Sequence, residues 1–66
     1  MVMDLELRLS DNVFEVHVVD SASGRYISLE YGDLGTIKPT IKSLIDKYKV
    51  NKIYKSDKPV LVNYHI

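Results

Sequence analysis

Glu6, His17 and Ser28 are the residue types of a hydrolase triad, in which a carboxylate orients a histidine and the histidine activates a hydroxyl nucleophile. They could act together only if three neighbouring strands set them in one row. Nucleophilic catalysis also needs oxyanion donors and a site that excludes water, and the open face of a small sheet offers neither. We therefore predict that the chain is not an enzyme. A hydrolase at this row is the third alternative.

The sequence predicts neither a metal site nor a cofactor site. The chain has two histidines, His17 and His65, and no cysteine, so it lacks the closely spaced ligand pairs of zinc sites. Its glycines, Gly24, Gly32 and Gly35, form neither a G-x-G-x-x-G nor a Walker-type sequence, and they are typical of turns. We expect no metal and no cofactor.

The row of three residues depends first on a hairpin. Residues 3–9 alternate apolar and polar side chains, which is typical of a strand with one buried face, and a second such strand follows at residues 13–19. Asp11 and Asn12 between them are turn formers. A two-residue loop there fixes which residues of the two strands face each other. On the apolar face the predicted pairs are Leu9 with Phe14, Leu7 with Val16, and Leu5 with Val18. On the other face they are Arg8 with Glu15 and Glu6 with His17. A slip of one residue would destroy both patterns.

A third strand is expected at residues 25–31, after a turn at residues 21–24. The apolar pattern sets Ile27, Leu29 and Tyr31 opposite Val18, Val16 and Phe14, and this register completes the row by setting Ser28 opposite His17. It also sets Glu15 opposite Glu30, an unfavourable pair of like charges.

From residue 37 the spacing of apolar residues changes to the 3.6-residue period of a helix. Thr36 is the expected N-cap, and Pro39 is expected in the first turn, where its missing N–H costs little. The predicted apolar face of the helix consists of Ile37, Ile41, Leu44, Ile45 and Tyr48. Residues 51–55 and 59–66 read as two further strands joined by a turn. The predicted fold is therefore a single α+β domain over residues 1–66, with the order βββαββ and a C-terminal hairpin.

A meander, a helix and a returning strand together resemble the opening topology of the ribonuclease H-like fold. Nucleases of that fold use carboxylates on a strand, on the helix and on a later strand. The residues that this resemblance nominates are Asp4, Asp46 and Asp57. Asp46 is expected on the solvent side of the helix and Asp57 in a turn, so we do not expect the three to converge on metal ions.

The size of the chain favours self-association. A helix of about 13 residues covers two or three strands, because strands lie about 4.8 Å apart and a helix is about 10 Å wide. Five strands would leave apolar surface uncovered, so we predict a homodimer formed by sheet packing or by strand-edge pairing. The last strand, with Val60, Val62 and Tyr64, is the predicted edge. The absence of cysteine favours the cytoplasm, and no segment is predicted to enter a membrane.

Charge is distributed unevenly along a chain of zero net charge. Residues 1–35 carry seven acidic residues and two arginines, a net charge of −5, and residues 36–66 carry seven lysines and two aspartates, a net charge of +5. The two halves are expected to neutralise each other within the fold or across a dimer. The alternative is that the lysines, together with one tyrosine, bind nucleic acid. The candidate residues are Lys38, Lys42, Lys49, Lys52, Tyr54 and Lys55.

The function we predict is that of a small non-enzymatic protein-binding module, an accessory or inhibitory factor that acts through a sheet edge or a charged face. Small proteins of this kind are frequent in phages and mobile elements. The terminal strand would pair with the main chain of the partner, and the acidic residues Glu6, Glu15 and Glu30 would attract a basic partner. The runner-up is a small nucleic-acid-binding regulator that uses the lysines.

Overall fold

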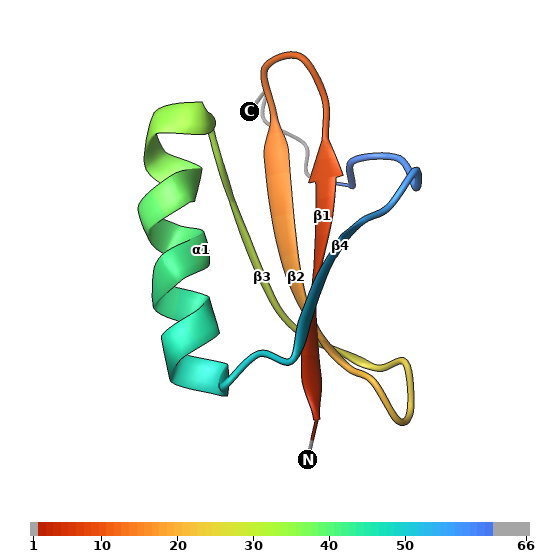
Figure 1. Cartoon of the computed structure of the whole chain (residues 1–66). Coiled ribbons are helices and arrows are strands. Elements are labelled where there is room, and N and C mark those ends of the chain that lie inside the picture. The colour runs from red at the N-terminus through yellow and green to blue at the C-terminus, as the bar shows by residue number, and fades with distance from the viewer. Residues whose placement is uncertain (1, 62–66) are drawn as a thin grey trace.

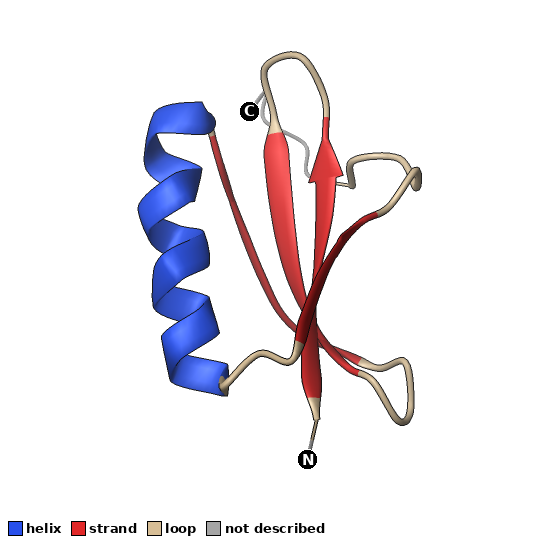
Figure 2. Cartoon of the chain, in the orientation of Figure 1, coloured by secondary structure: helices blue, strands red, loops and turns tan. Residues whose placement is uncertain are grey.

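The computed structural model describes residues 2–61 of the 66-residue chain. Its elements are β1 (Met3–Leu9), β2 (Phe14–Asp20), β3 (Tyr26–Gly32), α1 (Leu34–Tyr48) and β4 (Lys52–Lys55). They form one mixed sheet with the strand order β3-β2-β1-β4, and α1 packs on one side of it (Figures 1 and 2). We call the side that carries α1 the helix face and the opposite side the outer face. The predicted α+β class is confirmed, but the described residues form four strands where the sequence predicted five.

The hairpin of β1 and β2 has the predicted register. Every pair from Leu5 opposite Val18 to Arg8 opposite Glu15 is present, and Ser10 N donates to Val13 O at 2.9 Å to close the turn. Alternation of side chains along β1 sends its leucines to the helix face and its charged residues to the outer face. Leu5 is completely buried, as the pattern requires.

The predicted register of β2 and β3 is wrong by one residue. A bulge between Val18 and Val19 leaves Ile27 without an opposite residue, so His17 pairs with Leu29 instead of Ser28. An extra residue on one strand moves every later side chain to the other face. Ser28 and Glu30 therefore lie on the helix face, and the predicted pair of Glu15 with Glu30 does not form.

The helix begins one turn earlier than its predicted cap. Asp33 is the N-cap, and its carboxylate accepts a hydrogen bond of 3.0 Å from Thr36 N, so Thr36 lies inside the helix. Pro39 is correspondingly in the second turn and not in the first. The C-cap is Lys49, in the left-handed conformation with φ 53°. Among the described residues no helix is long and apolar enough to cross a membrane.

The core lies between α1 and the first two strands. Its buried members are Met3, Leu5, Val16, Val18, Ile37 and Leu44, and the predicted apolar face of α1 is confirmed by the packing of Ile41, Ile45 and Tyr48 against them. The helix lies over β2 and β3 and leaves β4 uncovered, so Ile53 on the helix face of β4 remains 47% exposed. One helix is therefore too narrow for this sheet, as its width predicts.

The fourth strand is parallel to the first. β4 pairs with β1 from Asp4 opposite Lys52 to Leu7 opposite Lys55, and Ser56 N then donates to Leu7 O at 2.8 Å. This pairing makes β1 a central strand and leaves β3 and β4 as the two edges. The chain then turns onto the outer face, where residues 56–61 contain no strand. Val60 therefore lies outside any strand, while Val62 and Tyr64 lie outside the described residues.

Candidate functional site

An exposed apolar stripe follows the edge strand β3. Leu29 and Tyr31 lie opposite His17 and Glu15 on the outer face, and Tyr26 lies opposite Val19 on the same face. The β3 stripe, as we call it, consists of Tyr26, Ile27, Leu29 and Tyr31. Their exposed fractions run from 40% to 56%, although all are large apolar or aromatic side chains. Contiguous exposed apolar residues on a small protein usually mark an interaction surface.

Four charged or titratable residues lie buried beside the stripe, on the outer faces of β1 and β2. We call Glu6, Arg8, Glu15 and His17 the ionic cluster; none is more than 4% exposed. His17 Nε2 lies 2.9 Å from Glu15 Oε1. Arg8 lies between the two glutamates, with Nε 3.5 Å from Glu6 Oε2 and Nη1 3.9 Å from Glu15 Oε1. Buried charges are costly unless they are paired, so this arrangement explains how the cluster is tolerated.

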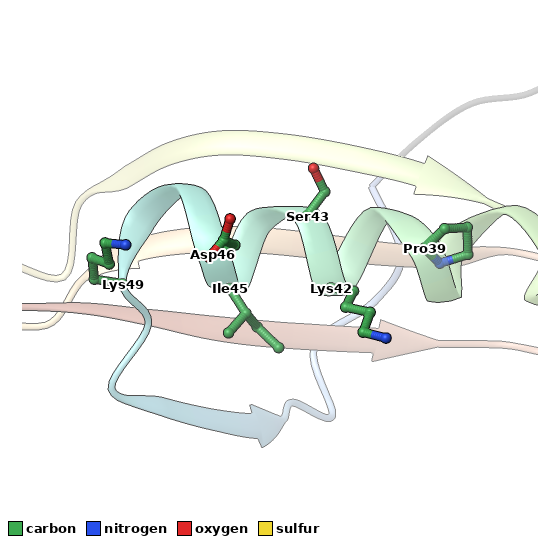
Figure 3. Close-up of a pocket in the computed structure, with 6 residues that line it drawn as sticks. All are labelled: Pro39, Lys42, Ser43, Ile45, Asp46 and Lys49. Carbon is green, nitrogen blue, oxygen red and sulfur yellow. The ribbon is translucent and has the colours of Figure 1, made fainter.

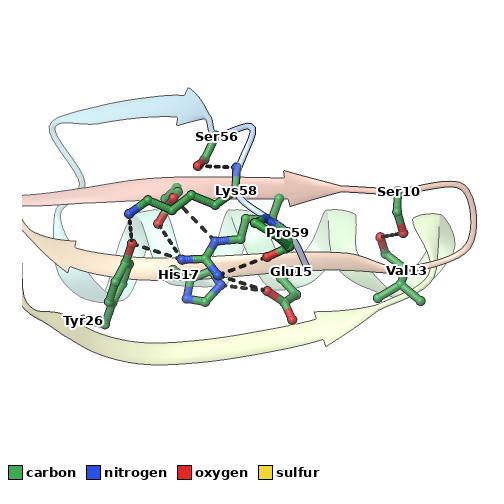
Figure 4. Close-up of polar contacts among 10 residues, drawn as sticks. Ser10, Val13, Glu15, His17, Tyr26, Ser56, Lys58 and Pro59 are labelled. Carbon is green, nitrogen blue, oxygen red and sulfur yellow. Dashed lines mark hydrogen bonds and ion pairs between the residues drawn. The ribbon is translucent and has the colours of Figure 1, made fainter. Parts of the chain in front are cut away.

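The ionic cluster is covered by Tyr26 and by the segment that follows β4. Arg8 Nη2 donates to the Tyr26 hydroxyl at 3.0 Å, and Lys58 Nζ donates to the same oxygen at 2.9 Å. Arg8 Nη1 donates to Pro59 O at 3.3 Å, and the rings of His17 and Tyr26 lie 5.1 Å apart. Figure 4 shows these side chains gathered on the face away from α1. Tyr26 therefore belongs both to the stripe and to the lid of the cluster.

Within the cluster, contacts between Glu6 and Arg8 offset the effect of burial on both side chains. Burial raises the pKa of Glu6. Opposing effects outweigh it: Glu6 accepts hydrogen bonds from the hydroxyls of Ser56 and Tyr26 and from Arg8, and it lies beside the positive charge of Arg8. The net pKa is therefore below the ordinary value of 4.5. Burial lowers the pKa of Arg8, but its hydrogen bonds to Tyr26 and Glu6 outweigh that effect and raise it. One cost remains, because Arg8 Nε is buried without a hydrogen bond even though it lies beside Glu6.

The triad row does not exist in the structure. Glu6 does lie opposite His17, but Ser28 lies on the helix face opposite Val18, on the other side of the sheet. His17 is bonded to Glu15. The hydrolase alternative therefore loses its nucleophile.

The predicted acidic partner surface is also not assembled. Glu6 and Glu15 are buried in the ionic cluster and cannot contact a partner, while Glu30 is exposed on the opposite face. Burial of the first two reflects the cover by Tyr26 and residues 56–61, which strand alternation alone could not reveal.

The lysines remain exposed, and Lys52 Nζ lies 5.2 Å from the centre of the Tyr54 ring, but the lysines of α1 are not beside this tyrosine. No ion pair among the described residues involves a lysine, so the two halves of the chain do not neutralise each other by direct contact there. Lys42 and Lys49 line a shallow depression formed by residues of α1 and its C-cap, with Asp46 between them (Figure 3). Lys38, Lys52 and Lys55 are also exposed. Tyr54 lies opposite Glu6 on the outer face, away from the lysines of α1.

The three carboxylates nominated by the topological resemblance are dispersed. Asp4 lies on the outer face of β1, Asp46 is exposed on α1 on the other side of the sheet, and Asp57 follows β4 in the segment that leaves the sheet. The part of the chain that the structure describes holds no group of three acidic, histidine or cysteine side chains able to bind a metal ion.

Two features of this region were missed by the sequence analysis: the burial of the ionic cluster and the exposure of the β3 stripe. The predicted cross-strand pairs of Glu6 with His17 and of Arg8 with Glu15 were a signal for the burial of the ionic cluster. The predicted like-charge pair of Glu15 with Glu30 was a signal for the different register that exposes the β3 stripe. Comparison with protein-family models, with curated proteins and with solved structures finds no match for this chain.

Proposed function

We propose that this protein is a non-enzymatic protein-binding module whose binding site is the edge strand β3. The observation that carries the proposal is the β3 stripe, which sets four exposed apolar side chains along an edge strand. An edge strand offers unpaired backbone N–H and C=O groups, and an extended segment of a partner can extend the sheet by bonding to them. The stripe would supply side-chain contacts, and the backbone would supply hydrogen bonds.

The β3 edge lacks most of the devices by which proteins block strand addition. Those devices are proline, lysine, very short strands and bulges. β3 is seven residues long and contains neither proline nor lysine, and its bulge is confined to the first two residues. The stretch from Ser28 to Gly32 pairs regularly with β2, and in the sheet formed by the described residues β3 is an edge strand, so it could receive a further strand in the same way.

Contacts from the ionic cluster and from Lys58 hold one residue of the stripe, Tyr26, in place. Tyr26 is held by hydrogen bonds from Arg8 and Lys58, and its ring lies 5.1 Å from that of His17. An aromatic side chain that is fixed before binding loses little conformational entropy on contact with a partner. Accordingly, we assign Arg8 and Lys58 the role of positioning Tyr26 for recognition.

The biological setting that we propose is an accessory or inhibitory role in the cytoplasm, as the cysteine-free composition suggests. A binding module acts by occupying a partner's surface, so no reaction is required of its own residues. Small modules of this kind suit phages and mobile elements, where one short gene can modify a host protein.

Site-specific photocrosslinking tests the proposal. The photoreactive residue benzoylphenylalanine replaces Leu29 in one variant and Ile53 in a control variant, because both are edge-strand residues with similar exposure, 40% and 47%. Irradiation of cells that express each variant should give protein adducts at position 29 and few at position 53, with the adducts identified by mass spectrometry. Equal labelling at both positions, or none at position 29, contradicts binding at β3.

The second candidate function is nucleic-acid binding by the lysines of α1. It is favoured by the absence of any ion pair to lysine among the described residues. Fluorescence anisotropy with single- and double-stranded oligonucleotides, over a series of salt concentrations, tests it against a variant with Lys38, Lys42 and Lys49 replaced by glutamate. Binding that weakens with salt and disappears in the variant supports this function. Because Tyr54 lies on the other face, Tyr54→Leu should leave such binding unchanged.

A further inference from the structure

We infer that the strand received by β3 is β3 of a second copy of this chain, in antiparallel orientation, with a two-fold axis at Leu29. This inference rests on the proposed use of the β3 edge and names its partner. Such pairing would join two four-stranded sheets into one sheet of eight strands. A two-fold contact of this kind is closed, because each copy uses its only β3 edge.

The register follows from the side chains of β3. Directly opposed residues in an antiparallel pair point to the same face, so the axis must pass through a residue and not between two residues. An axis at Glu30 would set two glutamates against each other. An axis at Ser28 would set Glu30 of one copy opposite Tyr26 of the other, although these two side chains lie on different faces. An axis at Leu29 avoids both conflicts.

The axis at Leu29 produces favourable pairs on both faces. On the outer face Leu29 meets Leu29 of the second copy, and Ile27 meets Tyr31 of the second copy, so the apolar residues of the β3 stripe cover one another. On the helix face Ser28 meets Glu30 of the second copy, and the serine hydroxyl can donate to the carboxylate. Apolar pairs and hydrogen-bonded pairs are the cross-strand contacts that stabilise sheets.

The helices also fit this arrangement. α1 lies over β2 and β3, close to the β3 edge. With strands about 4.8 Å apart, a two-fold axis at the edge brings the two helices to roughly 10 Å, which is a normal packing distance for helices. The side of α1 toward this edge carries Thr36, Thr40, Ser43 and Lys47, spaced by four, three and four residues. Thr36 adjoins Gly32 of β3, and Figure 3 shows Ser43 on this side. Threonine and serine are small enough for close approach of two helices.

Charge adds a complementary contact. α1 follows β3 after a single residue and runs back in the opposite direction (Figure 1), so Lys47, in the last turn of the helix, lies toward the level of the start of β3. The two-fold axis brings the start of one β3 beside the end of the other. Lys47 of each copy therefore comes within reach of Glu30 of the second copy. Within residues 2–61 neither residue takes part in an ion pair.

The apolar area of the β3 stripe supplies about half of the area that a stable interface buries. A large side chain exposes roughly 200 Å² when free, so the exposed fractions in the β3 stripe correspond to about 350 Å² per copy, or about 700 Å² for the pair. Stable interfaces bury about 1,200 Å² or more in total. The backbone edges and the side of α1 must supply the rest, and a dimer that forms at micromolar concentration is the expected outcome.

Single-cysteine crosslinking tests the register, because the natural chain contains no cysteine. Residues that face each other across an antiparallel pair have Cβ atoms about 5 Å apart, near the range of a disulfide. Under mild oxidation Leu29→Cys should form a covalent dimer, whereas Ser28→Cys and the exposed control Ile53→Cys should form little. Faster crosslinking at position 53 than at position 29 overturns the inference, and so does dominant crosslinking at position 28.

Analytical ultracentrifugation over a concentration series measures the dimer itself. Leu29→Lys should raise the dissociation constant by at least about tenfold, because two lysines would then meet at the axis, whereas Ile53→Lys should change it less than about twofold. Lys47→Glu should weaken the dimer, and adding Glu30→Lys to it should restore the affinity.

A chain that stays monomeric throughout this series overturns the second copy as partner. The proposed function is tested separately by the photocrosslinks at position 29. Adducts with another protein from a monomeric chain would leave the function of β3 intact and refute only the self-pairing. Adducts with this chain itself are the outcome that the inference predicts.

Discussion

The most informative perturbation of this fold is Arg8→Met. Arg8 is 2% exposed and is the positive charge that separates the buried carboxylates of Glu6 and Glu15. Methionine retains much of the apolar stem but removes the charge and the bonds to Tyr26 and Pro59. Removing one member of a buried ion pair costs about 3–5 kcal/mol, because the remaining charge is left uncompensated. A domain of this length has a free energy of unfolding of roughly 3–10 kcal/mol, so Arg8→Met should be close to unfolding at pH 7.

The pH dependence should be weaker in this variant. In the natural chain the pKa of Glu6 is lowered by folding, so ionised Glu6 stabilises the fold above its ordinary value of 4.5, and this contribution is lost as the pH falls through the lowered folded value. Without Arg8, burial still raises the pKa of Glu6, and the hydrogen bonds from Ser56 and Tyr26 are left to oppose it. Folding then lowers the pKa of Glu6 less, so Arg8→Met should lose less stability than the natural chain as the pH falls below 4.5.

Urea denaturation followed by circular dichroism at several pH values measures both effects. Arg25→Met is the matched control, because Arg25 is an exposed arginine whose guanidinium has no ion pair among the described residues. It should change the free energy of unfolding by less than about 0.5 kcal/mol. The reasoning is refuted if Arg8→Met is no less stable than Arg25→Met at pH 7, or if acidification destabilises both variants equally.

Three further predictions concern the helix and the core. Leu44→Ala should lower the free energy of unfolding by about 2–5 kcal/mol in urea titrations, because Leu44 is buried between α1 and the sheet. Asp33→Ala should lower the Tm and reduce the loss of stability below pH 3.8. The pKa of Asp33 is lowered by hydrogen bonds from the backbone and hydroxyl of Thr36, and the stability that this provides is lost as the pH falls below 3.8. Gly32→Ala should destabilise the fold by about 1 kcal/mol, because the added Cβ would overlap the hydroxyl oxygen of Thr36. A double-mutant cycle with Thr36→Ala measures the coupling, and the cost of Gly32→Ala should disappear when Thr36 is replaced.

The sequence predicted the elements of this fold better than their alignment. Two regularly alternating strands joined by a tight turn have only one register that buries the leucines of β1, so that register was correct. The register of β3 was wrong because a bulge has no fixed residue signature. The unfavourable pair of Glu15 with Glu30 was evidence against the apolar alignment, and in the structure Glu15 lies opposite Tyr31 instead. The charge conflict therefore indicated that the register was wrong, although the bulge itself lies three residues away, between Val18 and Val19.

The candidate site was predicted only in part for a different reason. Cross-strand pairing of Arg8 with Glu15 follows from the hairpin, but their burial depends on residues more than 40 positions away, such as Pro59. Period-two alternation reports which residues share a face; it does not report whether that face is covered. The outer face was therefore taken to be solvated, although Glu6 and Glu15 on it are less exposed than most of β3.

The parallel pairing of β1 with β4 has a consequence for the order in which the molecule assembles. Asp4 pairs with Lys52, so this contact closes a loop of 48 residues, which costs about 3 kcal/mol of chain entropy when formed alone. The meander and the helix involve much closer neighbours in the sequence and can form first. β4 is then the last strand to join and the first to detach, and its amide hydrogens should exchange with solvent sooner than those of β2. Until β4 joins, β1, which lies inside the finished sheet, is itself an edge strand.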